Sequence, residues 1–220
     1  MNPCVVPQPA PSRGEDGDRW MHIHNRFLSE TKEREPDVVI LGDSITSQLE
    51  QRGVWKEVFA PMHILNFSII GDQVQNVLWR VKNGELDNIK PKVVVLYVGE
   101  FNIRTSKPEE AIEGLLELVK TIKEKQQEAQ VLIQELLPRG LNPNPLRDSI
   151  ETFNNLLKES LKTEQNCKVI PVGDGIVKAD GTISHVDLVD WYYPSNDGYL
   201  KAFGPLIVEL KTILQKAGAA

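Results

Sequence analysis

Five short apolar runs recur along this chain, and the stretches between them have the spacing of amphipathic helices. The runs are "DVVILGD" (37–43), "HILNFSI" (63–69), "KVVVLYVG" (92–99), "AQVLIQELL" (129–137) and "CKVIPV" (167–172). They are too continuous in apolar residues for a sheet with one solvated face, so they predict strands buried on both faces. Strands that alternate with helices indicate an α/β fold with a doubly wound, parallel, five-stranded sheet.

The helical stretches can be placed from their periodicity and their ends. Apolar residues from Arg19 onward predict a first helix, and "PEEAIEGLLELVKTIKEKQQ" (108–127) predicts the clearest one, with acids at its start and lysines at its end. A final amphipathic helix follows "PSND", where Ser195 is a candidate N-cap. Residues 1–18 show no periodicity and predict a mobile tail, which leaves residues 19–217 as a single domain.

Composition excludes several classes of function. The net charge is −6 and no cluster of basic residues stands out, so we expect no nucleic-acid footprint. The apolar runs are strand-sized and far shorter than a membrane span, and the N-terminus does not resemble a secretory signal. Two cysteines do not make a disulfide framework, so a reduced, cytoplasmic protein is expected. No glycine-rich nucleotide motif and no metal-ligand spacing is present, and we therefore expect no cofactor and no metal.

Candidate chemistry lies where the predicted strands end, because doubly wound sheets bind ligands outside the carboxyl ends of their strands. Ser44, in "GDS" (42–44), follows the first strand at the start of a helix, where its own N–H would face a developing anion. Gly71, in "SIIGD" (68–72), could present a backbone N–H to the same point. Taken separately, Ser44 could equally be an ordinary helix cap and Gly71 an ordinary turn residue.

The third strand ends in "VGEFNIR" (98–104), which offers Asn102 as a side-chain donor. Glu100 and Phe101 occupy positions where a site for an oxyanion would need small side chains or hydrogen-bond donors. The chain has four histidines, which are His22, His24, His63 and His185. None follows a predicted strand, so each is interpreted as solvated or structural.

The order of these segments resembles that of the SGNH/GDSL esterases. "DRWMHIHNRF", "NVLWRVKNGELDNIKPKVVV" and "LLPRGLNPNPLR" are similar to the catalytic α subunits of intracellular platelet-activating factor acetylhydrolase Ib, and the similarity covers roughly residues 18–216. The resemblance implies a flavodoxin-like three-layer fold and a homodimer. It also implies removal of an acetyl group from a phospholipid by a Ser-His-Asp triad. Association with the lissencephaly WD-repeat protein is implied too, although a chain that has lost its active site has less reason to keep the surrounding surface.

Carried over by position, the resemblance makes Ser44 the nucleophile and Asp190 the triad aspartate. The N–H groups of Ser44 and Gly71 become two oxyanion donors. Two family positions are not matched. Tyr193 occupies the place of the catalytic histidine, and Phe101 occupies the place of the oxyanion asparagine.

These two departures from the family should abolish ester hydrolysis. A phenol cannot replace imidazole as a base, because free tyrosine has a pKa of about 10. Loss of a triad histidine costs on the order of 10⁶ in kcat in subtilisin, and loss of one oxyanion donor about 10² to 10³. Glu100 would also place a negative charge where an oxyanion must form. Ser68 and Ile70 replace glycines of the family and would narrow the pocket floor.

Three interpretations follow from the sequence. The first is an inactive homologue that acts as a dimeric, non-catalytic protein. The second is an active acetylhydrolase with an unusual base, although Asn102 is one residue out of place and His185 lies eight residues before Tyr193. The third is a lipid-binding module that uses the altered pocket.

Overall fold

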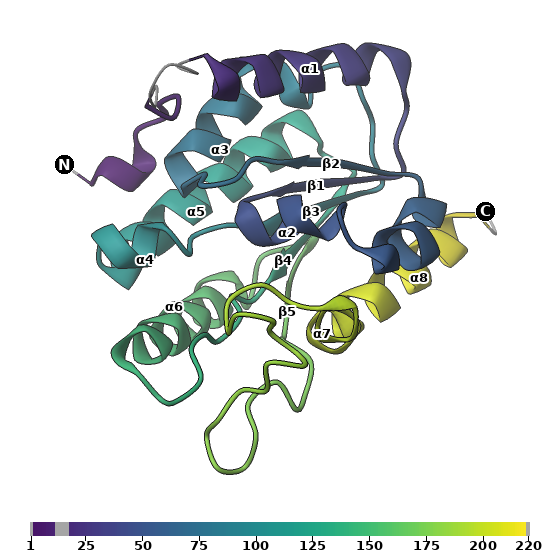
Figure 1. Cartoon of the computed structure of the whole chain (residues 1–220). Coiled ribbons are helices and arrows are strands. Elements are labelled where there is room, and N and C mark those ends of the chain that lie inside the picture. The colour runs from purple at the N-terminus through teal and green to yellow at the C-terminus, as the bar shows by residue number, and fades with distance from the viewer. Residues whose placement is uncertain (1, 12–17, 219–220) are drawn as a thin grey trace.

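A central parallel sheet with helices on both faces forms the body of the molecule (Figure 1). The computed structural model describes residues 2–11 and 18–218. The strands are β1 (Val38–Gly42), β2 (Ile64–Ser68), β3 (Val93–Tyr97), β4 (Gln130–Gln134) and β5 (Cys167–Ile170). Their order is β2-β1-β3-β4-β5, and every neighbouring pair is parallel. The predicted doubly wound, five-stranded α/β fold is therefore confirmed.

The helices form the two outer layers. One layer holds α1 (Arg19–Glu33), α3 (Val74–Arg80), α5 (Pro108–Lys125) and α6 (Pro145–Leu161); the other holds α2 (Ser44–Leu49), α7 (Asn196–Ala202) and α8 (Gly204–Gly218) (Figure 1). The remaining elements are short, namely η1 (Pro3–Val5) before α1 and, between the longer elements, η2 (Trp55–Phe59), η3 (Ala60–Met62), η4 (Val81–Glu85) and α4 (Asn102–Thr105).

The core explains why the strand sequences are apolar throughout. Every residue of β1, β2 and β3 is buried, because helices cover both faces of the sheet. The chain winds from β1 to β2 in one direction and then places β3 on the other side of β1. This reversal of direction is the switch point at which such sheets usually bind ligands.

The predicted helices are confirmed, with one difference at the C-terminus. The helix predicted at 108–127 is α5, and the hydroxyl of Ser195 accepts the N–H of Gly198 at 3.0 Å, which confirms the N-cap. The final helix is divided into α7 and α8, because Phe203 leaves the helical conformation before α8 begins at Gly204.

The N-terminal stretch differs from the predicted mobile tail. Cys4 is fully buried in η1, against α5, and the N–H of Gln8 donates to the carbonyl of Gln75 at 3.2 Å. A stretch of this length is too short for periodicity to reveal the packing. Residues 1 and 12–17, which belong to the same predicted tail, lie outside the described residues.

No helix within residues 2–11 and 18–218 has the length and apolar character needed to cross a membrane.

Candidate active site

The turn between β1 and α2 places Ser44 at the carboxyl end of the sheet. Asp43 caps α2 by accepting the N–H of Ile45 at 3.1 Å, and Ser44 is the first residue of the helix. A side chain at Gly42 would meet the hydroxyl of Thr46 at 2.1 Å, so the strand can approach the helix this closely only with glycine. The serine is fully buried in this turn.

Gly71 lies next to Ser44, as the sequence predicted. Its backbone N–H donates to the Oγ of Ser44 at 3.1 Å. Its φ of 84° is in the left-handed region, which glycine adopts without strain. The connection from β2 to α3 thus brings a backbone donor beside the serine, which is the region where an oxyanion hole would need its donors.

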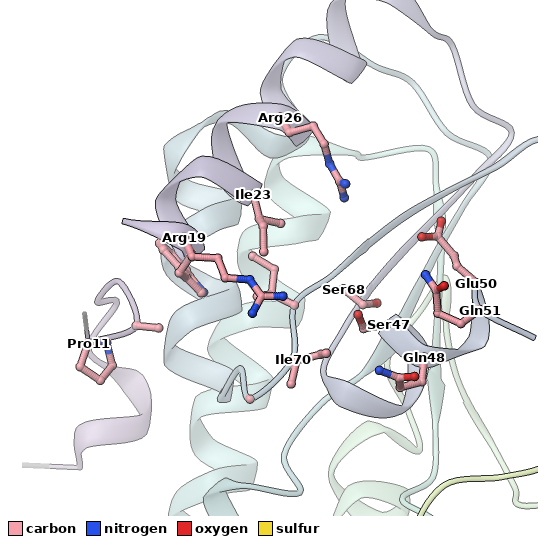
Figure 2. A pocket seen from close by; sticks show the side chains of 14 residues that line it. Pro11, Arg19, Ile23, Arg26, Ser47, Gln48, Glu50, Gln51, Ser68 and Ile70 are labelled. Atoms are coloured by element: carbon pink, nitrogen blue, oxygen red, sulfur yellow. The ribbon is translucent and has the colours of Figure 1, made fainter. Parts of the chain in front are cut away.

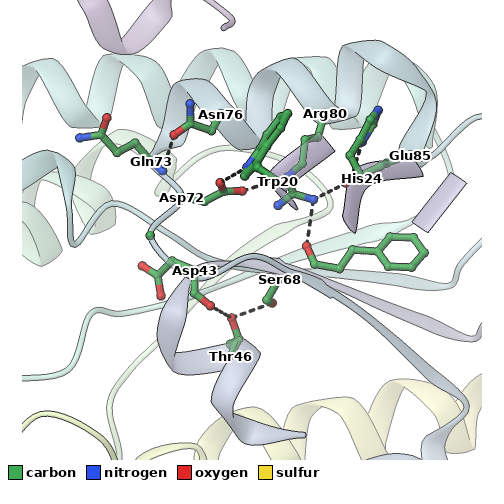
Figure 3. Close-up of polar contacts among 12 residues, drawn as sticks. Trp20, His24, Asp43, Thr46, Ser68, Asp72, Gln73, Asn76, Arg80 and Glu85 are labelled. Carbon is green, nitrogen blue, oxygen red and sulfur yellow. Dashed lines mark hydrogen bonds and ion pairs between the residues drawn. The ribbon is translucent and has the colours of Figure 1, made fainter. Parts of the chain in front are cut away.

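Asp72, the residue after Gly71, anchors this connection inside a buried polar network (Figure 3). It accepts the indole N–H of Trp20 at 2.6 Å and the Nε of Arg80 at 2.9 Å. Arg80 also pairs with Glu85, which lies 2.9 Å from Nδ1 of His24. Burial raises the pKa of Asp72 to about 6, and Arg80 opposes that rise only in part.

Ser68 and Ile70 lie in different surroundings near this turn. The hydroxyl of Ser68 lies 2.6 Å from Oδ1 of Asn66 and 2.8 Å from the hydroxyl of Thr46. Ile70 is 52% exposed. Both residues line a neighbouring cavity.

That cavity has a volume of about 600 Å³ and lies between α1, α2 and the connection after β2 (Figure 2). Trp20 and Ile23 contribute apolar surface from α1, and Arg19 and Arg26 contribute charge from the same helix. Gly71 lines the cavity but Ser44 does not, so the cavity borders the turn at Gly71 and not the serine itself.

Glu100 is fully buried where β3 ends, and two arginines pair with it. Oε2 accepts from Nη2 of Arg139, which follows β4, and Oε1 accepts from Nη2 of Arg104 at 2.9 Å. A buried carboxylate needs such partners, because an unpaired charge inside a protein is costly. Burial, with the charge of Glu100 adding to it, raises the pKa of Asp43 well above its usual range.

Phe101 and Asn102 point to different surroundings. Phe101 is half-buried, with the guanidinium of Arg104 5.4 Å from its ring centre. Asn102 is fully buried and committed to α3, since its Oδ1 accepts the N–H of Val74 at 2.9 Å and its Nδ2 donates to Gln75 at 2.8 Å. With both ends of its amide engaged in this way, Asn102 is not available to a substrate oxygen at Ser44.

Asp190 lies in an exposed turn and caps its own backbone. Its Oδ1 accepts the N–H groups of Tyr192 at 3.1 Å and Tyr193 at 2.8 Å. Tyr193 is half-buried and meets the ring of Tyr192 edge-on, with ring centres 4.5 Å apart. The guanidinium of Arg139 lies 3.5 Å from the ring centre of Tyr192, so the last loop is tied to the one after β4.

The histidines agree with their structural interpretation. His24 is buried against Glu85, whereas His22, His63 and His185 are exposed. Across residues 2–11 and 18–218, no group of three or more His, Cys, Asp or Glu side chains could hold a metal ion.

Sequence reasoning did not single out Arg139 or Arg104 as partners of Glu100. A signal was available, because a carboxylate directly after a buried strand needs a nearby cation. Arg139 follows the neighbouring strand at the same edge of the sheet. Arg104 is four residues further along the chain from Glu100.

A family model for GDSL-like lipases and acylhydrolases matches residues 40–201, which is most of the chain. This chain belongs to that family. The match runs from β1 into α7 and includes Ser44, Gly71 and Asp190.

Curated relatives narrow the relationship further. The chain is 44% identical over 215 residues to the platelet-activating factor acetylhydrolase IB subunit alpha2 of Gallus gallus, covering 98% of this chain and 93% of the relative. It is 43% identical over 217 residues to the IB subunit beta homolog of Drosophila melanogaster, covering 98% of this chain and 95% of the relative. The chain is therefore also a homologue of the platelet-activating factor acetylhydrolase IB subunits.

Solved structures share the fold. A GDSL-like lipase from Bacteroides thetaiotaomicron superposes with a TM-score of 0.70 at 16% identity, covering 88% of this chain and 98% of that one. A member of the lipolytic G-D-S-L family from Veillonella parvula gives a TM-score of 0.53 at 18% identity, covering 74% of this chain and 91% of that one. At such low identity the likeness bears on the fold alone.

Proposed function

We propose that this chain is a catalytically inactive homologue of the platelet-activating factor acetylhydrolase IB subunits that acts as a dimeric, non-catalytic protein in the cytoplasm. The observation that carries the proposal is the conformation and sequence of the loop that contains Asp190 and Tyr193. Asp190 caps its own turn, and Tyr193 stands where the resemblance requires the base. Ser44 then has no imidazole to take its proton, and a serine hydroxyl is a weak nucleophile without an adjacent base.

The third-strand loop supports the same proposal. Phe101 has no side-chain donor for an oxyanion, and Glu100 brings a buried negative charge to this edge of the sheet. Its charge is balanced by Arg139 and Arg104, so the cations in this region are engaged with Glu100. Two catalytic parts are thus replaced, while the backbone N–H of Gly71 lies within hydrogen-bond distance of Ser44.

A serine-dependence assay tests the proposal. Hydrolysis of an acetylated phospholipid and of a nitrophenyl acetate is compared between the unmodified chain and Ser44→Ala, and equal rates are expected. Turnover that disappears in Ser44→Ala would instead favour the alternative of an active acetylhydrolase with an unusual base.

Lipid binding is a second candidate function, favoured by the cavity beside Gly71. Its volume of about 600 Å³ is in the range of small-molecule sites, and it combines apolar side chains with Arg19 and Arg26. Calorimetric titration with an acyl phospholipid tests this candidate. Heat that saturates, and that is lost in Arg26→Ala, supports it; no saturable heat rejects it.

The proposals on assembly and partners come from the relatives, which are named as subunits. Light scattering during size-exclusion chromatography tests the homodimer, for which twice the mass of the chain is expected. A pull-down against the lissencephaly WD-repeat protein tests whether that association is retained. A chain that is monomeric and is not captured would contradict the proposed subunit role.

A further inference from the structure

The N-terminal segment 2–8, called the strap below, lies against α5 and α3, which belong to one layer (Figure 1). At one end, the Nδ2 of Asn2 donates to the carbonyl of Glu110 on α5 at 2.9 Å. At the other end, the N–H of Gln8 donates to the carbonyl of Gln75 on α3 at 3.2 Å. The strap is thus fixed to α5 and to α3 by hydrogen bonds that join residues far apart in the sequence.

The middle of α5 is shaped to receive the strap. A side chain at Gly114 would lie 2.5 Å from the carbonyl oxygen of Cys4 and 2.8 Å from its Cβ, which is closer than atoms can approach. Glycine in a helix interior destabilises the helix relative to alanine. Close seating of Cys4, which is fully buried here, gives a physical reason for a glycine at this position.

Cys4 connects the strap to the loop that follows β3. The Nδ2 of Asn102 lies 3.2 Å from the Sγ of Cys4, while its Oδ1 accepts the N–H of Val74 on α3. The Sγ also lies 3.7 Å from the hydroxyl of Ser106, just after α4. Asn102 is therefore held from two sides, by the strap and by α3, and it is two residues from the buried Glu100.

We propose that the strap positions the loop of residues 99–106. Its docking on Gly114 holds this loop in the conformation that buries Glu100 and directs Asn102 away from Ser44. When the strap leaves, Asn102 loses its sulfur contact and the backbone bonds of α4 open more often. These include Ser106 N–H to Asn102 and Ile103 N–H to Gly99. The inference concerns the conformation of this loop and holds whether or not the chain hydrolyses an ester.

The test uses the full-length chain with Cys167→Ser, so that Cys4 is the only thiol. Two quantities are measured, the rate at which a thiol reagent labels Cys4 and the hydrogen exchange of the amides in residues 99–106. Gly114→Ala is the releasing variant, and Gly204→Ala is the matched control, because nothing lies within 4 Å of a side chain built at Gly204.

We expect slow labelling of Cys4 in the parent chain compared with the same chain in denaturing urea. Gly114→Ala should raise both the labelling rate and the exchange of residues 99–106 by about tenfold or more, as local opening becomes easier. Gly204→Ala should change neither. Cys4→Asp should release the strap in another way, because a carboxylate is costly to bury at this position. It should raise the hydrogen exchange of residues 99–106 while Gly114 is left unchanged.

Three results would overturn the inference. One is labelling of Cys4 in the parent chain as fast as in urea, because the strap would then not be docked. Another is Gly114→Ala leaving the labelling rate unchanged. The third is faster labelling of Cys4 in Gly114→Ala with no change in the exchange of residues 99–106, because the strap would then not position the loop.

Discussion

The backbone N–H of Gly71 donates to Oγ of Ser44 at 3.1 Å, in a turn that buries the serine completely. The carboxylate of Asp190 is exposed and accepts the backbone N–H groups of Tyr192 and Tyr193. We therefore infer that a backbone donor is present at Ser44, whereas the side chains at positions 193 and 101 do not supply the base and the donor that the resemblance to the family requires.

Repair of these side-chain positions should create an esterase. We predict that Tyr193→His with Phe101→Asn and Glu100→Thr gives serine-dependent hydrolysis of a nitrophenyl acetate at least about 100-fold above background, which is a modest share of what a triad histidine contributes. The first change supplies a base, the second a donor, and the third removes the buried charge. Initial rates measured by absorbance check the prediction.

Two controls accompany this repair. Adding Ser44→Ala to the repaired chain should abolish the new activity, and leaving Glu100 in place should give a lower rate than the triple variant. A repaired chain that folds, as judged by circular dichroism, but hydrolyses nothing would contradict the assignment of Tyr193 and Phe101.

Removal of the charge at Glu100 should destabilise the fold. We predict that Glu100→Gln lowers the free energy of unfolding by about 3–5 kcal/mol, because the buried guanidinium of Arg139 is left without its anion. Urea denaturation followed by circular dichroism measures the change. Glu128→Gln, at an exposed position, is the matched control and should shift the value by less than about 0.5 kcal/mol. Equal effects of the two variants would contradict the structural role of the pair.

The fold could be predicted from sequence because its strands have an unmistakable signature. Each apolar run contains its strand, as "KVVVLYVG" (92–99) contains β3, since burial on both faces demands a continuous run. The short elements could not be predicted in this way. The chain from Trp55 to Met62 forms two brief helices, and such turns are too short to show a period.

The pH dependence of stability should report on Asp72. Burial raises its pKa to about 6, above the value of about 3.9 in an unfolded chain. The native state thus binds this proton more tightly, so the stabilisation is fully present below about pH 4 and is lost as pH rises through about 6. The size of this loss is about 3 kcal/mol.

Asp72→Asn isolates that contribution. The difference in unfolding free energy between the parent chain and Asp72→Asn is measured by urea denaturation from pH 4 to pH 7. We expect the parent chain to lose stability relative to the variant as pH rises. A difference that stays constant, or that moves in the parent chain's favour, would contradict the raised pKa.

The candidate site was predictable only where residues follow strands directly. Ser44 and Gly71 follow β1 and β2, so parallel topology alone brings them to one edge of the sheet. The surroundings of Glu100 depend on Arg139, which is 39 residues away and reaches it through tertiary packing. The packing of Cys4 against Gly114 likewise joins two segments that are far apart in the sequence, and no local sequence pattern predicts their contact.

The most direct test of the central claim is the release of acetate from an acetylated phospholipid by the purified chain, measured against Ser44→Ala under identical conditions. We predict that the two rates are indistinguishable, because a phenol at Tyr193 cannot act as the base that activates Ser44. A rate for the unmodified chain that clearly exceeds that of Ser44→Ala would contradict this prediction.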